Sequence, residues 1–177
     1  YRVPVKIVLN KIDLYRDDPE LVEKVKLFHS IYEDAGYQIK DVSVAENIGI
    51  DELRSECNNG GISLFSGVSG VGKSSLIKAL DPSLEPKISQ ISDKHLQGRH
   101  TTTFYEIYPL QGGGFIIDTP GIRGFGLVDL ELEELSAYFP EMLRVEDECR
   151  FKPCTHTHEP GCAVVKGVEE GIISLER

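Results

Sequence analysis

The sequence predicts an α/β fold, a mostly parallel sheet with helices on both faces, followed by a small cysteine-rich subdomain. Two observations predict this division. As far as residue 118, apolar runs typical of strands alternate with segments of helical apolar spacing, which is the pattern of a parallel sheet covered by helices. Beyond Leu130, short helical pieces replace the alternation, and three of the four cysteines fall within residues 149–162. We therefore expect one domain over residues 1–126 and a second over residues 127–177.

The composition is that of an ordinary globular protein. The 177 residues include 19 Lys plus Arg and 29 Asp plus Glu, a formal charge of −10, and 40% are hydrophobic; these values exclude disorder and collagen-like repeats. No apolar run approaches the roughly 18 residues that span a bilayer, and the first residues lack the order of a signal peptide. We expect a cytoplasmic monomer without a membrane partner. The acidic balance argues against a broad phosphate-binding surface, so any RNA partner must be met locally or by parts outside this chain.

A strand and an amphipathic helix open the chain. Residues 3–9 form an almost continuous apolar run rich in β-branched residues, which is typical of a strand buried on both faces. Asp17 or Asp18 can cap the helix that follows, Pro19 suits its first turn, and Gly36 ends it. Six apolar residues of this helix share one face, namely Leu21, Val22, Val25, Phe28, Ile31 and Tyr32.

Two more strand and helix pairs follow. A strand is expected over residues 37–44 with a short helix over residues 50–57, and another strand over residues 61–66 with a helix over residues 73–80. The polar stretch over residues 81–99 contains two prolines and predicts a loop.

A hairpin is predicted next. Strands over residues 103–110 and 114–118 are joined by Gln-Gly-Gly-Gly, and a short glycine-rich connection between two apolar runs is typical of antiparallel pairing.

The strongest chemical signal is Gly-Val-Ser-Gly-Val-Gly-Lys-Ser at residues 67–74, a full match to G-x-x-x-x-G-K-[ST] between a predicted strand and a predicted helix. Backbone amides of such a loop wrap a phosphate, and the helix N-terminus faces it with its positive dipole end. Lys73 should reach the β- and γ-phosphates, and the Ser74 hydroxyl should bind Mg²⁺. The alternative is a chance glycine turn before a helix. The expected phosphate-binding residues are Gly67, Val68, Ser69, Gly70, Val71, Gly72, Lys73, Ser74 and Ser75.

A second motif selects the base. Asn10, Lys11 and Asp13 belong to the sequence Asn-Lys-Ile-Asp, which follows the first predicted strand. The Asp13 carboxylate can accept two hydrogen bonds, from guanine N1 and N2, which adenine cannot supply. Ser43 and Val44 end the next strand, where a backbone N–H can meet guanine O6. The alternatives are a surface turn for the first motif and an ordinary strand end for the second.

Two further segments point to a divalent cation and a nucleotide switch. Asp118 closes a predicted strand beside the phosphate loop, where its carboxylate can hold Mg²⁺ through water, while the Gly121 amide senses the γ-phosphate. Thr101, Thr102 and Thr103 end the long polar loop, and one of them can close on Mg²⁺ when the γ-phosphate is present. The alternatives are a Pro-Gly turn and a threonine-rich strand start.

These motifs resemble the set of guanine-specific GTPases, in an unusual order. The phosphate loop comes first in most GTPases, whereas here the base-recognition segments precede Gly67 and the threonine and Asp-x-x-Gly segments follow it. We therefore expect a circularly permuted domain, which is feasible when the original termini lie close together.

The cysteine segment indicates metal chemistry. Cys149, Cys154, His156 and Cys162 have the spacing and donor types of a closed tetrahedral Zn²⁺ site, one structural ion per chain. His158 is the rival fourth ligand. The alternative, buried thiols without metal, is unattractive because the surrounding residues are too polar for a core.

The permuted order combined with a C-terminal Cys/Cys/His/Cys site resembles the ribosome small-subunit-dependent GTPases of the RsgA (YjeQ) family. The resemblance rests on NKID, GVSGVGKSSL, HTTT, DTPG and CRFKPCTHTHEPGCAV and covers essentially the whole chain. It implies hydrolysis of GTP to GDP late in assembly of the small (30S) ribosomal subunit, stimulated by that subunit and its rRNA, followed by release. It also implies an N-terminal OB-fold barrel. Neither that barrel nor the strand and helix that complete the sheet is present in this sequence, so we expect a fragment, truncated also after Arg177.

The resemblance also bears on catalysis. It favours Thr102 as the switch threonine that binds Mg²⁺, and His100 as the group that orients the attacking water. Ile122 stands where Ras-like enzymes have a water-orienting glutamine. On the sequence alone, His100 is equally well explained as a solvated loop histidine. Two rival functions stay open: a P-loop ATPase or kinase, and a nucleotide-independent zinc module that binds RNA or protein.

Overall fold

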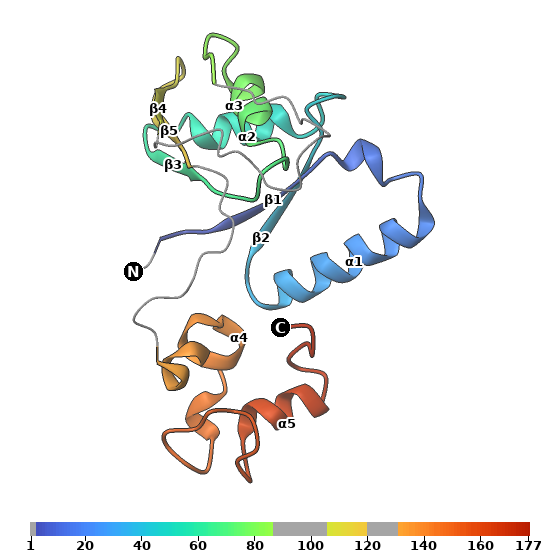
Figure 1. Ribbon diagram of the computed structural model, residues 1–177, viewed down its shortest axis with the longest axis vertical. Helices are drawn as coiled ribbons and strands as arrows, with labels where there is room; N and C mark the ends of the chain where they lie inside the picture. Colours follow the sequence, from blue (N-terminus) through green and yellow to red (C-terminus); the bar gives the residue numbers. More distant parts are fainter. Residues whose placement is uncertain (1–2, 87–105, 120–130) are drawn as a thin grey trace, which may run out of the picture. The chain divides into compact units, whose positions relative to one another are not determined.

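The computed structural model describes residues 3–86, 106–119 and 131–177 (Figure 1). Within these residues the chain divides into two units. The first, the helical unit, combines residues 3–7, 18–39 and 131–177, and the second, the sheet unit, combines residues 8–17, 40–86 and 106–119. None of the described helices is long and apolar enough to cross a membrane.

A three-stranded sheet organises the sheet unit, in the order β3 (Ile62–Phe65), β5 (Phe115–Asp118) and β4 (Glu106–Pro109). β3 and β5 are parallel, with Phe65 opposite Asp118, and β4 is antiparallel to β5. The predicted hairpin is confirmed. Gly113 and Gly114, with φ of 97° and 93°, form its turn in the left-handed region that favours glycine.

Two helices and the sheet enclose the core of this unit. α2 (Ile50–Cys57) and α3 (Lys73–Leu80) begin and end where the sequence predicts them. Ile50, Ile77 and Ile116 are completely buried, one each from α2, α3 and β5. Phe65, which ends β3, packs against this core as well, so the elements on both sides of the loop from β3 to α3 rest on it.

β1 (Lys6–Asn10) pairs with β2 (Gln38–Val42) in a separate two-stranded sheet. The predicted strand over residues 3–9 begins later than expected, and its burial on both faces is wrong: Val3 and Val5 are 71% and 58% exposed. The physical reason is that β2 is the one strand beside β1 within the described residues, so much of the apolar run packs against nothing described.

The helix α1 (Pro19–Asp34) follows its local signals. The Asp18 carboxylate accepts hydrogen bonds from the backbone N–H groups of Glu20, at 2.9 Å, and Leu21, which satisfies amides that no helical carbonyl can reach. Gly36 adopts φ +98° just after the helix, as the expected stop requires.

The C-terminal part of the helical unit consists of short pieces, as the sequence predicts: η2 (Leu132–Tyr138), α4 (Pro140–Leu143), η3 (Glu146–Glu148) and α5 (Ala163–Glu169). Their core is small and built around the three clustered cysteines with Val164 and Ile173.

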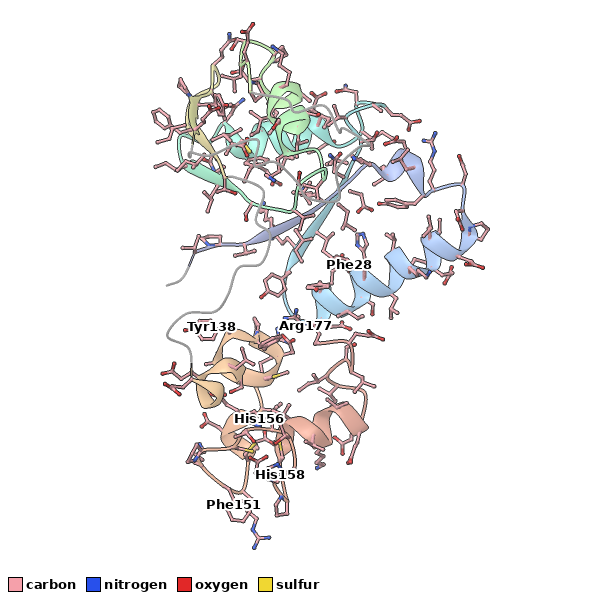
Figure 2. The ribbon with its side chains drawn as sticks, in the orientation of Figure 1. Phe28, Tyr138, Phe151, His156, His158 and Arg177 are labelled. Atoms are coloured by element: carbon pink, nitrogen blue, oxygen red, sulfur yellow. The ribbon has the colours of Figure 1, made fainter. Side chains whose placement is uncertain are left out.

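The last part of the chain contacts α1 inside the helical unit (Figure 2). Arg144 donates from Nη1 and Nη2 to the backbone oxygens of Asp34 and Ala35, at 2.8 and 2.9 Å. These carbonyls end α1 and have no helical partner, so the guanidinium satisfies them and favours the negative end of the helix dipole. The guanidinium of Arg177 lies 4.9 Å from the ring centroid of Tyr32.

Candidate functional site

The predicted phosphate loop connects β3 to α3 in the sheet unit. Gly70 and Gly72 adopt φ of 86° and 95°, a backbone conformation that residues with a side chain rarely adopt. Gly72 is the N-cap of α3, and its carbonyl accepts the N–H of Leu76 at 2.8 Å. The loop therefore turns directly into the helix, and the first amides of α3 remain available to an anion. Ser74 and Ser75 stand half-buried on that first turn.

Lys73 bends back over the same loop. Its Nζ donates to the backbone oxygens of Gly67 at 2.6 Å and Val68 at 3.3 Å. Two carbonyls of the loop thus hold the ammonium against it, where a cation can complete an anion site formed by backbone amides.

Asp118 lies at the carboxyl end of β5, opposite Phe65 in the register of the parallel pair. The residue is 4% exposed, and its Oδ1 is buried with no hydrogen-bond partner among the residues that the structure describes. Burial raises the pKa of this carboxyl, and the Lys73 ammonium partly offsets the rise. A buried carboxylate oxygen requires a donor or a cation, and a hydrated Mg²⁺ ion would satisfy this requirement. The carboxylate therefore fits a role in holding Mg²⁺ through water.

Asn10 and Lys11 join the base motif to the phosphate loop, 61 and 59 residues away in sequence. Asn10 Nδ2 donates to the backbone oxygen of Val71 at 2.9 Å, and Lys11 Nζ donates to that of Gly70 at 2.7 Å. The approach is so close that a Cβ on Gly72 would lie 2.5 Å from Asn10 Nδ2. The two motifs thus form one continuous site in the sheet unit.

Asp13, the last residue of the base motif, contacts the segment that begins with Ser43. Ser43 Oγ donates to Asp13 Oδ1 at 2.5 Å, and the backbone N–H of Glu46 donates to Ser43 Oγ at 3.1 Å. Ser43 is completely buried, which limits the competition of water for these bonds. Backbone hydrogen bonds between Ser43 and Ile48 close the turn that carries Val44.

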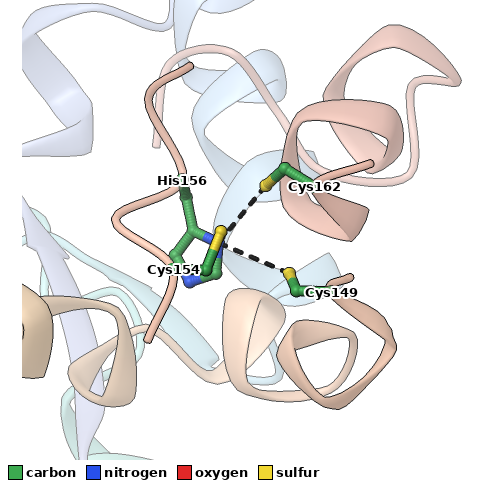
Figure 3. A group of neighbouring side chains, drawn as sticks. All are labelled: Cys149, Cys154, His156 and Cys162. Atoms are coloured by element: carbon green, nitrogen blue, oxygen red, sulfur yellow. Dashed lines mark hydrogen bonds between the residues drawn. The ribbon is translucent and has the colours of Figure 1, made fainter. Parts of the chain in front are cut away.

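The four predicted metal ligands gather in the helical unit (Figure 3). Their ligand atoms all lie within 4.8 Å of one another. His156 Nδ1 is 3.3 Å from Cys162 Sγ and 3.7 Å from Cys149 Sγ, and Cys154 completes the group. Three sulfurs and one imidazole nitrogen at such spacing can hold a metal ion, and this donor set suits Zn²⁺.

The backbone around the cluster favours thiolates. The N–H of Ala163 points to Cys149 Sγ at 3.3 Å, and that of Val165 to Cys162 Sγ at 3.4 Å. Burial first, and then the neighbouring sulfurs of Cys162 and Cys149, raise the pKa of the Cys154 thiol to about 11, because surroundings of low polarity penalise negative charge. A divalent cation among the sulfurs supplies the opposite charge that thiolates in this place require.

The structure distinguishes the two histidines of the segment (Figure 2). His156 faces the sulfurs, whereas His158 is exposed, and its Nδ1 contacts the Thr157 hydroxyl at 2.8 Å. Glu159 holds the connecting loop, since its carboxylate accepts from Thr155 N at 2.8 Å and from Thr155 Oγ1 at 2.6 Å. These hydrogen bonds hold the pKa of Glu159 well below its usual range, and the bond from the Thr155 hydroxyl has the largest effect.

Comparison with known proteins shows to which family the chain belongs. The sequence profile of the RsgA GTPase family matches residues 1–128. The chain belongs to the RsgA GTPase family.

Curated members of the RsgA family match the whole chain. The small ribosomal subunit biogenesis GTPase RsgA of Bacteroides fragilis is 51% identical over 177 residues, a match that covers 100% of this chain and 56% of the relative. The small ribosomal subunit biogenesis GTPase RsgA 2 of Bacteroides thetaiotaomicron is 48% identical with the same coverage. The chain thus spans little more than half the length of these relatives.

Two solved structures support the same assignment. The crystal structure of YjeQ from Thermotoga maritima has a TM-score of 0.81 and 36% identity over 99% of this chain and 56% of that chain. YloQ, described as a circularly permuted GTPase, has a TM-score of 0.72 and 27% identity over 97% of this chain and 52% of that chain. The predicted α/β fold of the permuted GTPase family is confirmed.

Some predicted site residues lie outside the described residues, namely His100, Thr101, Thr102, Thr103 and Gly121, and so does Ile122. Sequence reasoning in turn missed Arg16 and Glu46, which join the two base segments, and the role of Glu159 in the metal loop. No local pattern marks the first pair, because its members are 30 residues apart.

Proposed function

We propose that the complete protein hydrolyses GTP as a late assembly factor of the small ribosomal subunit, and that this subunit and its rRNA stimulate the hydrolysis. The observation that carries the proposal is the contact of Asn10 and Lys11 with the phosphate loop, which makes one site of the base and phosphate motifs. Membership of the RsgA GTPase family supports GTP as the substrate. The names of the two Bacteroides relatives support the small subunit as the partner.

Each part of the nucleotide has a proposed partner. Asp13, Asn10 and Lys11 recognise guanine with the Ser43 and Val44 segment, and residues 67–75 bind the phosphates. Ser74, Asp118 and Thr102 would hold Mg²⁺, which neutralises charge on the phosphate oxygens when bound. The buried Asp118 Oδ1, which has no hydrogen-bond partner in the described part of the chain, supports this part of the assignment. The Gly121 amide would sense the γ-phosphate.

Catalysis in this proposal depends on positioning. Lys73 stabilises charge on the β- and γ-phosphates, Thr102 orders the site around the γ-phosphate, and His100 orients the attacking water because Ile122 cannot.

The metal site has a structural role in this proposal. One Zn²⁺ is held, with no open position for catalysis, by Cys149, Cys154, His156 and Cys162. The nucleotide domain would span residues 1–126 and the zinc subdomain residues 127–177.

GTP hydrolysis by the complete protein, with and without small subunits, tests the function. We expect the subunits to raise the rate by about 100-fold or more, since ordering catalytic groups contributes several kcal/mol and each ~1.4 kcal/mol is tenfold. His100→Ala should lose most of this stimulation with GTP affinity nearly unchanged, whereas His29→Ala, a change on α1, should keep it. An unstimulated parent contradicts the proposed function. A fully stimulated His100→Ala protein contradicts only the role of His100.

A further inference from the structure

Two loops carry the proposed guanine-binding groups, and they are joined at two points. The first loop, residues 10–16, follows β1 and contains Asp13, and the second, residues 43–48, follows β2 and begins with Ser43. Both belong to the sheet unit. The first joint is the buried hydrogen bond from Ser43 Oγ to Asp13 Oδ1, at 2.5 Å.

The second joint is a two-point ion pair that neither motif contains. Arg16 Nη1 lies 2.5 Å from Glu46 Oε2, and Arg16 Nη2 lies 2.6 Å from Glu46 Oε1. Parallel contacts of this kind fix the orientation of both side chains as well as their distance. The neighbouring Asp17 is a weaker partner, 4.0 Å from Arg16 Nε and 92% exposed.

Local hydrogen bonds make each half of this arrangement stiff. In the first loop, Arg16 N–H donates to the carbonyl of Ile12 at 3.2 Å, which fixes Arg16 relative to Asp13. In the second loop, the backbone N–H of Glu46 donates to Ser43 Oγ at 3.1 Å. The residues Asp13, Ser43, Glu46 and Arg16 therefore form a closed ring, two from each loop.

We propose that Arg16 and Glu46 are positioning residues for guanine recognition, a clamp that holds the two loops at the spacing in which Asp13 meets the base. The inference rests on the proposed function. Asp13 depends on Ser43 for its orientation, and Ser43 stays in place only while its loop does. Opening the clamp leaves one joint, about which the loops can turn, so the contact between Asp13 and the exocyclic amine of guanine weakens first.

The test compares GDP with inosine diphosphate, which lacks the exocyclic amine, in Arg16→Gln and Glu46→Gln proteins. We expect each change to speed GDP release about two- to fivefold, the range of a well-oriented pair at a partly exposed site. The ratio of GDP to inosine diphosphate affinity should fall toward one. The charge-swapped protein, Arg16→Glu with Glu46→Arg, should recover part of both losses. Lys26→Gln, which removes an exposed ion pair with Glu23 on α1, should change neither.

Three results would overturn the inference. They are unchanged GDP release in both single variants, equal loss of affinity for GDP and inosine diphosphate, and a swapped protein no better than the singles. Unfolding midpoints of all variants separate a folding defect from a positioning defect, and Arg16→Lys provides a milder change that keeps the charge. A parent chain that binds ADP as well as GDP contradicts the proposed function instead, so the two failures are distinguishable.

Discussion

The carboxylate of Asp13 is oriented by a neighbour from another segment. One of its oxygens accepts from the buried Ser43 hydroxyl at 2.5 Å, and this bond leaves the carboxylate its other lone pairs for a ligand. The residue that we propose to select the base is therefore positioned by a contact 30 residues away in sequence.

An Asp13→Asn change should exchange the base preference. The amide cannot accept two hydrogen bonds from guanine N1 and N2, so GDP affinity should fall about 10- to 100-fold, the size of a lost bond to a charged group. The new amide N–H groups suit xanthine, whose O2 accepts, so xanthosine diphosphate should bind better than to the parent. Equilibrium titration with both nucleotides measures the exchange. Asp17→Asn, at an exposed neighbour, serves as control and should bind as the parent does.

Asp81 is a buried carboxylate with a structural role. It follows α3, is 5% exposed, and accepts hydrogen bonds from Ser83 Oγ at 2.6 Å and from the backbone N–H of Gln111 at 2.9 Å. These hydrogen bonds hold the pKa of Asp81 below its ordinary value. The bond from the Ser83 hydroxyl has the largest effect and the bond from the Gln111 N–H the next largest. The residue thereby joins the end of α3 to the hairpin of β4 and β5.

The pH dependence of stability follows from this shift. Because the pKa of Asp81 is lower in the folded state, the unfolded state binds more protons. The contribution of Asp81 to the free energy of unfolding is therefore complete above the unfolded pKa of about 3.9. This contribution is lost as the pH falls through the folded pKa. Asp81→Asn should cost about 1–3 kcal/mol at pH 7. Urea unfolding of both proteins from pH 7 to pH 3 should show the difference shrinking in acid. A constant difference would contradict this account.

Among the elements, Arg177 is joined to α4 by a buried ion pair and to α1 by a cation–π contact. Arg177 Nε donates to Glu141 Oε1 at 2.6 Å, and the two side chains are 12% and 7% exposed. The guanidinium carbon lies 4.9 Å from the ring centroids of both Tyr32, on α1, and Phe139. Cation–π contacts strengthen where the cation is desolvated, so this pair ties α1 to the C-terminal elements of the helical unit.

Removing only Arg177 from this ion pair should lower the free energy of unfolding strongly, and removing both Arg177 and Glu141 should lower it much less. Arg177→Met leaves the Glu141 carboxylate buried without its cation, which typically costs about 3–5 kcal/mol. Arg177→Met combined with Glu141→Leu removes both charges and keeps apolar volume, so we expect it to regain most of the loss. The chain has no tryptophan, so urea unfolding followed by circular dichroism is a suitable measurement. Independent, additive effects of the two changes would show that the pair is not coupled.

Across the whole molecule, the two units depend on different sources of stability. The sheet unit has an apolar core drawn from α2, α3 and the sheet. The core of the helical unit includes the three cysteines of the metal cluster among its five buried members. A core this small rarely supplies enough free energy by itself, and metal binding then contributes directly to folding.

Chelation of zinc should therefore unfold one unit selectively. About one zinc per chain should co-purify, and its removal should speed hydrogen exchange in residues 131–177. It should also speed exchange in α1, because Arg144 and Arg177 hold that helix in the same unit. Residues 62–80 should stay protected and GDP should still bind, since the phosphate and base residues lie in the sheet unit. Slow exchange of the C-terminal peptides in zinc-free protein would refute a metal-dependent fold.

Local signals let the sequence by itself determine much of this protein. The cap at Asp18, the left-handed glycine at Gly72 and the hairpin glycines act within a few residues, so the limits of α1, α3 and the hairpin follow from sequence. The spacing of the metal ligands is equally local, and this spacing together with the permuted motif order gave the resemblance to the RsgA family.

Only the tertiary structure decided which distant segments meet. It brings Asn10 to the phosphate loop across 61 residues, closes Arg16 on Glu46, turns His156 and not His158 toward the sulfurs, and groups α1 with the C-terminal elements. The physical reason is that such contacts carry no local pattern. They form when the packing of two segments offsets the entropy of closing the long loop between them, and that balance depends on the whole fold.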